Sequence, residues 1–161
     1  MGFGKLHVGY CVYGVYKLSK LSKSAICILQ SQIAAMNIKI KTYEPAKEYE
    51  LLLALIKSEG EEWKDYFDPK YQAVLEKSIT YVAYADGKLC GYSRSIDDFG
   101  LYIWVIDLLV DERYRGHSIG RKLMECVLAD YPNQDVFVMS DVDEYYEKLG
   151  YKKEGSIFQV R

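Results

Sequence analysis

Residues 103–124 have the sequence IWVIDLLVDERYRGHSIGRKLM, and this stretch predicts the fold around it. An apolar run leads into a short charged turn containing Arg115, Gly116, Ser118 and Gly120, and an amphipathic run follows, so the pattern predicts a strand, a tight loop and a helix. Backbone NH groups in such a loop and in the first helical turn lack intrahelical partners, and the helix dipole adds about half a positive charge there. The stretch is therefore suited to hold a phosphate or pyrophosphate.

Length and charge limit the classes of protein to consider. A chain of 161 residues, half of them apolar, has the size and composition of one globular domain. The formal net charge is −2, and because residues 1–35 contain four lysines and no acidic residue, the remainder carries −6. A mildly acidic body argues against a nucleic-acid-binding protein and suits a cationic substrate.

Cysteine and histidine are too sparse to indicate a metal site or a disulfide framework. The four cysteines are widely spaced without a CxxC pair, and the chain has two histidines. We therefore expect reduced thiols, a cytoplasmic location and no metal. The N-terminal apolar run is too short and interrupted for a signal peptide, and no stretch is long enough to span a membrane, so no membrane partner is expected.

Residues 1–35 lack clear periodicity and precede an ordered alternating pattern that begins after Met36. They form either an extra packed element or a poorly ordered leader, and their composition favours the leader. We place no catalytic residue in them. The predicted domain covers residues 36–161.

The first half of this domain predicts a strand at residues 38–42 and a helix from Pro45 to Gly60. Residues 61–78 predict one or two short helices with an aromatic face, which either form a lid or the wall of a pocket, or pack in a core or dimer interface; packing is favoured. The segments ITYVAYA and KLCGYSRS flank Asp86-Gly87, a dipeptide that favours a type I′ hairpin turn. Residues 101–110 predict a strand buried on both faces, interrupted by Asp107.

The second half predicts a helix after the loop, a buried strand at 135–139, a further helix and a last strand at 156–160. In the final helix, Asp141 and Glu144 form a variant of the capping box and Gly150 ends the helix. The helix after the loop has an apolar side formed by Ile119, Leu123, Met124, Val127 and Leu128. The element order predicts one α/β domain with a mixed sheet, in which antiparallel hairpin strands join parallel crossover units.

Three stretches resemble the GNAT superfamily of acyl-CoA-dependent N-acetyltransferases over residues 36–161. VDERYRGHSIGRKLM is similar to the family's pyrophosphate-binding motif, with Arg115 opening it, Gly120 closing it and Ser118 where glycine is usual. DEYYEKLGY resembles the late helix whose tyrosine, here Tyr146, commonly protonates the departing thiolate. GYSRSIDDF resembles a bacterial subset whose hairpin arginine and aspartate, here Arg94 and Asp98, face the acceptor.

The resemblance implies a GNAT-like fold, with a mostly antiparallel sheet, a splayed parallel pair of strands and about four flanking helices. It implies acetyl-CoA as cosubstrate, with the strand end bonding the pantetheine arm and the loop NH groups holding the pyrophosphate. We interpret His117 as a solvent or phosphate contact. The implied cofactor-binding residues are Leu108, Leu109, Val110, Arg115, Gly116, His117, Ser118, Ile119, Gly120 and Arg121.

Three side chains have alternative interpretations. A buried carboxylate is costly unless paired, so Asp107 either binds or deprotonates the amine, through water if needed, or neutralises Arg94 or local backbone donors. Tyr146 is either a core residue or the general acid, for which water is a substitute. Serine in place of the usual glycine at position 118 is tolerable unless the position requires positive φ, and its hydroxyl would cap the helix or contact a phosphate.

The sequence thus predicts a cytoplasmic N-acetyltransferase in which a primary amine attacks acetyl-CoA directly, with Tyr146 and Asp107 as catalytic residues. No cysteine lies beside a histidine to support a covalent acyl-enzyme. The alternative is a non-catalytic acyl-CoA-binding regulatory module. The expected acceptor is a small-molecule or peptide amine, and the chain is expected to be a monomer or homodimer.

Overall fold

The computed structural model describes residues 36–160; the predicted N-terminal extension, residues 1–35, lies outside the described residues, as does Arg161. The first half contains β1 (Ile38–Thr42), α2 (Pro45–Ser58), a 3-10 helix η1 (Glu61–Phe67), α3 (Lys70–Lys77), β2 (Ile79–Ala85) and β3 (Lys88–Asp97). The second half contains β4 (Tyr102–Val110), a 3-10 turn η2 (Glu112–Tyr114), α4 (Ile119–Asp130), β5 (Asp135–Val138) and α5 (Asp143–Lys148).

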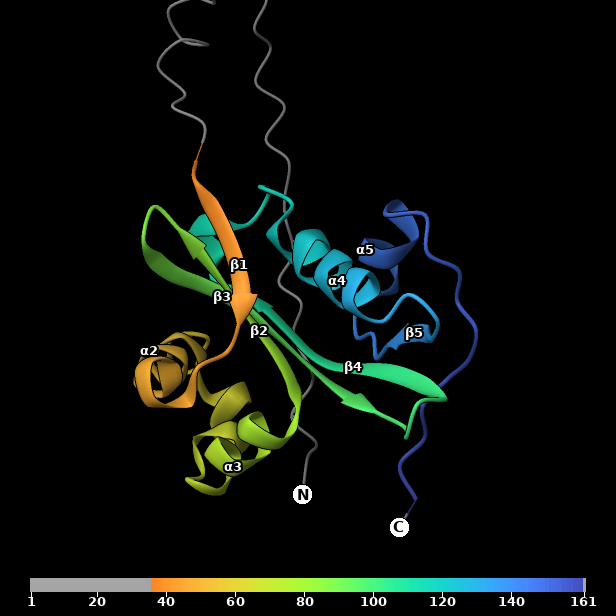
Figure 1. The fold of residues 1–161 in the computed structure, drawn as a ribbon, viewed down its shortest axis with the longest axis horizontal. Helices are drawn as coiled ribbons and strands as arrows, with labels where there is room; N and C mark the ends of the chain where they lie inside the picture. Colours follow the sequence, from red (N-terminus) through yellow and green to blue (C-terminus); the bar gives the residue numbers. More distant parts are fainter. Residues whose placement is uncertain (1–35, 161) are drawn as a thin grey trace, which may run out of the picture.

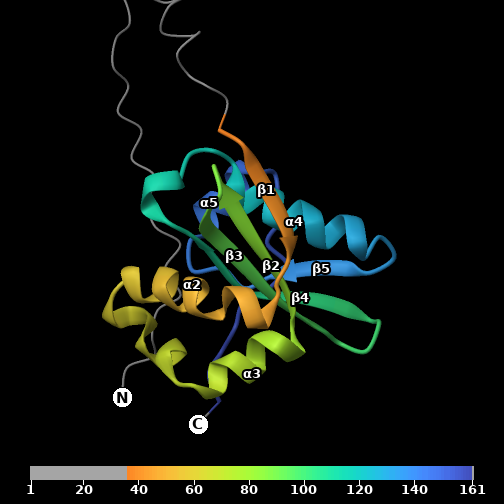
Figure 2. The same ribbon diagram turned by 60° about the vertical axis from the view of Figure 1, so that its left-hand side comes forward.

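The five described strands form one sheet in the order β1-β2-β3-β4-β5. Neighbouring strands are antiparallel except β4 and β5, which run parallel. Helices α2 and α3 lie on one face and α4 and α5 on the other (Figures 1 and 2). This is the predicted mixed, mostly antiparallel sheet with one parallel pair.

Each face of the sheet has its own apolar core. The face under α4 and α5 buries a cluster that includes Tyr81, Ile103, Leu108, Ile119, Leu123, Val127 and Tyr146. The opposite face buries a cluster that includes Leu52, Ile56, Trp63, Tyr71, Leu75, Tyr92 and Leu109. Strand β4 contributes to both clusters, so it lies between the two layers of helices.

Several predicted elements are confirmed because local sequence decides them. Asp86 and Gly87 have φ values of 48° and 82°, as a type I′ hairpin turn requires. The residues predicted as one or two short helices form η1 and α3, and their aromatic side chains mostly pack in the core, with Trp63 and Tyr71 buried.

The predictions were wrong at one edge of the sheet. Strand β5 is half-buried rather than buried, because it is the last strand of the described sheet. Residues 156–160 form no strand, and Ile157, Phe158 and Val160 are exposed by 62%, 83% and 93%. An alternating apolar pattern becomes a strand only where a neighbouring strand accepts its hydrogen bonds, and no described strand pairs with this segment.

Two helix details also differ. Leu128 is 46% exposed, because a row of residues spaced by four drifts about 40° per step around a helix of 3.6 residues per turn. The predicted capping box does not form: α5 begins at Asp143 after Val142, without a side-chain cap. Gly150 follows the helix with φ 83°, as predicted for its end.

Strand β4 contains a bulge that decides which way its side chains face. Arg94 pairs with Asp107, but the next residue of β3 pairs with Val105, so Ile106 is an extra residue on β4. Because side chains alternate along a strand, one extra residue places Asp107 on the face opposite that of Val105. Asp107 therefore lies under α2 and α3.

The α2 helix offers a test of the packing between helix and sheet. Leu52 is fully buried and its neighbour Leu51 is 51% exposed. We expect Leu52→Ala to lower the free energy of unfolding by about 2–5 kcal/mol, because it leaves a cavity. Leu51→Ala, the matched control, should change it by less than about 0.5 kcal/mol in the same urea titration. Equal effects of the two substitutions would contradict the packing described.

Candidate functional site

Strands β4 and β5 separate halfway along β4. They pair from Tyr102–Asp135 to Val105–Val138, and a bond from the Met139 NH to the Val105 carbonyl (3.0 Å) is the last one between them. Beyond this point β4 continues to Val110, paired only with β3 among the described strands. Apart from the Val110 carbonyl, which accepts from the Arg115 side chain, the edge from Leu108 to Val110 is therefore open to a ligand that hydrogen-bonds as a strand does.

The predicted anion-binding loop follows this open edge. Within residues 36–160, the NH groups of Gly116, His117 and Ser118 donate to no backbone carbonyl. The first bond of α4 runs from the Lys122 NH to the Ser118 carbonyl (3.0 Å), so the NH groups of the first helical turn are also without intrahelical partners. These NH groups and the positive end of the helix dipole fit a pyrophosphate.

Ser118 occupies a left-handed backbone conformation, with φ 59° and ψ 21°. A position of this kind favours glycine, because a Cβ atom crowds the neighbouring carbonyl. The Ser118 hydroxyl makes no capping hydrogen bond, so the expected cap does not form. Because position 118 has positive φ, serine is poorly tolerated there.

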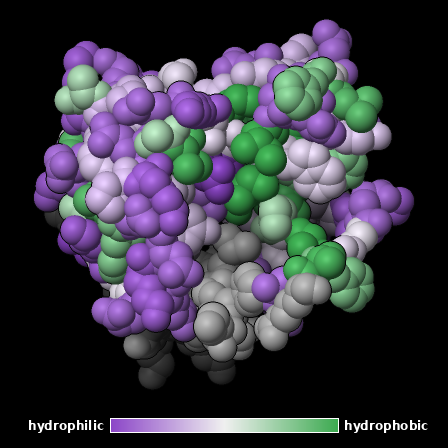
Figure 3. All heavy atoms as spheres, turned by 90° about the horizontal axis from the view of Figure 1, so that it is seen from below, coloured by the Kyte–Doolittle hydropathy of each residue, from purple (hydrophilic) through white to green (hydrophobic). Residues whose placement is uncertain are grey.

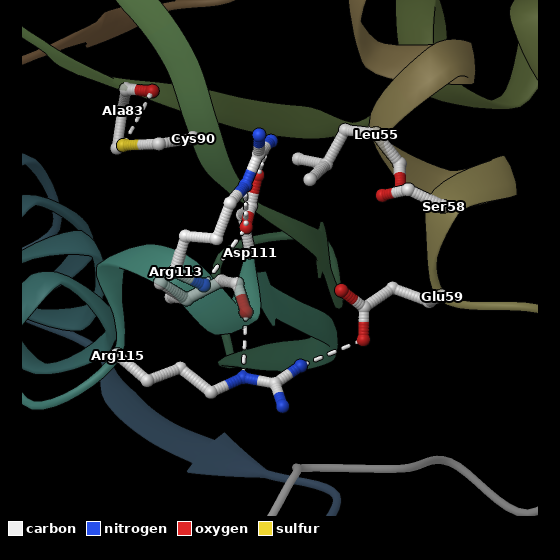
Figure 4. A network of polar contacts seen from close by, with 9 residues as sticks. Leu55, Ser58, Glu59, Ala83, Cys90, Asp111, Arg113 and Arg115 are labelled. Atoms are coloured by element: carbon white, nitrogen blue, oxygen red, sulfur yellow. Dashed lines mark hydrogen bonds and ion pairs between the residues drawn. The ribbon is translucent and has the colours of Figure 1, made fainter.

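The side chain of Arg115 points away from the loop NH groups. Its Nε donates to the Val110 carbonyl (2.8 Å), and one terminal nitrogen donates to Glu59 at the end of α2 (2.6 Å), as Figure 4 shows for Glu59. Arg115 thus ties the loop to β4 and to the helix on the opposite face. Its backbone remains part of the loop.

His117 and Arg121 lie at the solvent side of the loop. The Nδ1 atom of His117 lies 3.2 Å and 3.0 Å from the carbonyls of Tyr114 and Arg115, so it donates a proton and leaves Nε2 outward. Arg121 pairs with Glu125 one turn along α4 at 2.7 Å. Both side chains are exposed and close to the loop NH groups.

Helix α5 packs directly against the first turn of α4. A Cβ atom placed on Gly120 would come within 2.8 Å of the Tyr145 hydroxyl and 3.6 Å of Leu108. Glycine at this position therefore permits the close approach of α4, α5 and the end of β4.

Tyr146 brings an unpaired hydroxyl into this region. Its side chain is 5% exposed, packs in the same cluster as Leu108 and Ile119, and its hydroxyl has no hydrogen-bond partner among the described residues. Burial, followed by the neighbouring Tyr145 and Asp141, raises the pKa of Tyr146 above its usual value. The phenol is therefore a proton donor with a free hydrogen bond to give.

Asp107 is fully buried and receives hydrogen bonds from three elements. Its Oδ2 accepts from Arg94 Nε (2.5 Å) and from the Tyr71 hydroxyl (2.7 Å), and its Oδ1 accepts from the Tyr66 hydroxyl (3.0 Å). Tyr92 extends the network through a 3.1 Å contact with Tyr71. Of the two interpretations of Asp107, the pairing with Arg94 is present in the structure, and a role in proton transfer stays a prediction.

The two phenols in this network are functional candidates that the sequence did not single out as donors. Burial, followed by the charge of Asp107, raises the pKa values of Tyr66 and Tyr71, so both stay protonated and donate. They lie about 40 residues before Asp107, and their sequence signal was the aromatic face predicted for residues 61–78, which did not indicate that they donate to Asp107. Tyr66 is the partly exposed member and links η1 to β4.

Arg94 and Asp98 are not brought together. Arg94, on β3, is 9% exposed and bound to Asp107, whereas Asp98 is exposed in the turn after β3. Asp98 follows Arg94 by four positions, which corresponds to about 13 Å of extended chain.

Other kinds of site receive no support from the described residues. A pocket of about 350 Å³ is lined by Tyr43, Tyr81 and Asp130 among others, and no residue of the loop lines it. Between residues 36 and 160, no three His, Cys, Asp or Glu side chains are grouped to hold a metal ion, and no helix has the length and apolar content needed to cross a membrane.

Part of the chain is similar to known acetyltransferases. Residues 76–153 match the family model described as an acetyltransferase (GNAT) domain. The chain is 31% identical over 70 residues to GCN5-related N-acetyltransferase 2, chloroplastic, from Arabidopsis thaliana. That match covers 40% of this chain and 27% of the relative, so the chain spans about a quarter of the relative's length.

Solved structures share the fold. A GNAT-family acetyltransferase from Streptococcus pneumoniae matches 78% of this chain and 99% of its own, with a TM-score of 0.58 and 23% identity. An aminoglycoside acetyltransferase from an uncultured soil metagenomic sample matches the same shares with a TM-score of 0.61 and 22% identity. An aminoglycoside N-acetyltransferase in complex with CoA matches 78% and 95%, with a TM-score of 0.62 and 13% identity. Residues 76–153 therefore match a GNAT acetyltransferase domain, and the solved structures show that the chain shares its fold with GNAT acetyltransferases.

Replacing Ser118 tests the loop geometry. Ser118→Gly should raise the free energy of unfolding by about 1 kcal/mol, because glycine removes the strain of the left-handed conformation. Ser118→Ala keeps the strain and loses no capping bond, so it should leave stability within about 0.5 kcal/mol of wild type. Urea denaturation measures both, and a loss of stability in the glycine variant would contradict the conformation described.

Removing the Asp107 charge tests the buried network. We expect Asp107→Asn to lower the free energy of unfolding by about 3–5 kcal/mol, because Arg94 is left buried without its counter-ion. Asp98→Asn, an exposed change on the same hairpin, is the control and should have little effect. The double variant Asp107→Asn, Arg94→Gln should recover part of the loss. A stable single variant would show that the pair contributes little.

Proposed function

We propose that this chain is an N-acetyltransferase that transfers the acetyl group of acetyl-CoA to a primary amine by direct attack. The observation that carries the proposal is the buried, unpaired hydroxyl of Tyr146 beside the open edge of β4 and the unpaired NH groups of the loop before α4. A strand edge and an anion cradle suit the binding of a CoA thioester, and a proton donor meets the need of the departing thiolate.

The residues divide these tasks among them. The loop NH groups from Arg115 to Gly120 would hold the pyrophosphate of the cosubstrate, with His117 and Arg121 near its outer side. The edge from Leu108 to Val110 would bond the pantetheine arm, and one of its NH groups would polarise the thioester carbonyl. Acetyl-CoA supplies the activated acyl group.

The reaction then needs two proton movements. The amine nitrogen attacks the thioester carbon, a C–N bond forms, the C–S bond breaks, and the nitrogen loses one proton. Tyr146 gives its phenolic proton to the leaving sulfur and recovers one from solvent. The amine proton leaves through water on the side of Tyr66 and Asp107, and we assign to Asp107 the positioning of Arg94 and Tyr66 at that side.

The acceptor is expected to be a small-molecule amine. The structural relatives named as aminoglycoside acetyltransferases support this class, as does the acidic charge of the body of the chain. A peptide amine remains the second candidate. The predicted domain of residues 36–161 and the cytoplasmic location belong to the same proposal.

Tyr146→Phe tests the assignment of the general acid. The variant should lower kcat by about 10²-fold while leaving the affinity for acetyl-CoA unchanged, because only the transferred proton is lost. Release of CoA thiol over a panel of small amines measures turnover, and Tyr151→Phe serves as a control that removes a nearby phenol. Because the pKa of Tyr146 is raised, wild-type activity should rise with pH as the acceptor loses its proton and should show no decline below about pH 10.

The alternative, a non-catalytic acyl-CoA-binding module, gives a different result. Acetyl-CoA would then raise the melting temperature while CoA-thiol release stayed at background with every amine. That outcome would overturn the proposed activity and keep the cofactor site.

A further inference from the structure

Three aromatic side chains form a connected surface on β4 and β5. The rings of Trp104 and Phe137 are stacked, with centroids 5.0 Å apart and an interplanar angle of 28°. Tyr102 meets both rings edge-on, at 6.3 Å from Trp104 and 5.4 Å from Phe137. We call Tyr102, Trp104 and Phe137 the aromatic platform.

Strand register places this platform beside the Asp107 network. Ile96, Trp104 and Phe137 form one row across three strands, and Arg94 and Asp107 form the next row on the same face. Helices α2 and α3 cover this face over β2 and β3. The platform lies farther along the sheet, where its three rings stay half-buried and Ile96 is 44% exposed.

A contiguous, half-exposed aromatic surface is unusual unless something binds it. Burying such rings completely would be favourable by several kcal/mol, and exposed apolar patches mark binding sites. Figure 3, which views the molecule from below, shows a band of hydrophobic side chains between more hydrophilic flanks, without labelling the three rings. The stacked pair fixes a flat surface before any ligand arrives, which favours a planar group.

The charged residues near the aromatic platform indicate which charge the planar ligand group carries. Asp98 and Asp135 are the backbone neighbours of Tyr102 on its two sides, through the bond from the Asp98 NH to the Tyr102 carbonyl (2.9 Å) and the pairing of Tyr102 with Asp135, and both carboxylates are exposed. Arg94, the basic residue in the neighbouring row of this face, is already paired with Asp107. A planar cation would contact an aromatic face and two carboxylates, whereas an anion would meet repulsion.

The distance along β4 sets the length of the ligand. Trp104 lies four residues before Leu108, where the open edge begins, which is about 13 Å of strand. We propose that the platform binds the far end of the amine acceptor, and that this end is a planar group with a positive charge. This inference rests on the proposed N-acetyltransferase function, and it defines the acceptor as an elongated amine with its nucleophile at one end.

Tryptophan fluorescence tests binding without requiring turnover. The chain has two tryptophans, and Trp63 is buried in the core. In a Trp63→Phe variant with bound CoA, titration with 4-(4-aminobutyl)benzamidine should change the fluorescence emission of Trp104, and the change should reach a plateau as the ligand concentration rises. The isosteric carboxylate, 4-(4-aminobutyl)benzoate, should bind at least tenfold more weakly. If the variant does not fold, the difference between wild type and Trp104→Ala gives the same signal.

Kinetics with acetyl-CoA gives the second test. Trp104→Ala should raise KM for 4-(4-aminobutyl)benzamidine at least tenfold and leave KM for butylamine within twofold, because butylamine is too short to reach the platform. Phe99→Ala is the matched control, since Phe99 is fully exposed in the adjacent turn and should change neither value.

The outcomes separate the two proposals. Saturable binding of the amidine without turnover of any amine would overturn the proposed function and keep the platform as a binding site. Turnover of butylamine with equal affinity for amidine and carboxylate, or with no effect of Trp104→Ala, would overturn the platform and keep the function.

Discussion

The buried carboxylate of Asp107 is the constraint on which the arrangement of this domain depends. A charge in the interior costs several kcal/mol unless donors replace its lost water, and three donors from three elements converge here. Arg94 comes from the neighbouring strand, Tyr66 from η1 and Tyr71 from α3. The helical layer on this face is therefore fixed to the sheet at a polar point, in addition to the apolar packing around Leu52 and Tyr92.

Strand β4 connects this network to the open edge. Asp107 faces α2 and α3, while Leu108 faces α4 and the cluster that contains Tyr146. A ligand bonded along Leu108 to Val110 would thus have the phenol of Tyr146 on one side and the Asp107 network on the other. Arg115 joins the end of this strand to Glu59, the residue that caps α2, so side-chain hydrogen bonds connect the loop, the strand and the opposite helix.

Much of this architecture follows from local sequence, and the differences have physical reasons. The Asp86-Gly87 turn and the strand, loop and helix around Gly116 are specified by neighbouring residues, so pattern analysis finds them. Three other features depend on tertiary partners. They are the left-handed φ of Ser118, the hydrogen bonds that Tyr66 and Tyr71 donate to Asp107, 36 to 41 positions away, and the lack of a strand at residues 156–160. A sequence pattern records none of these partners. The roles of Asp107, Tyr146 and the cofactor-binding residues remain predictions until they are measured.

The extra residue in β4 determines which changes of chain length this strand tolerates. Ile106 can be exchanged for another side chain without altering which residues face which layer of helices. Deleting Ile106 would make Val105 and Asp107 consecutive, and strict alternation would keep both on their present, opposite faces and in register with β3. One residue inserted after Asp107 would instead exchange the faces of the rest of the strand. Among descendants of such a gene, substitution or loss of the codon for Ile106 should accumulate, whereas a codon inserted after Asp107 should be eliminated.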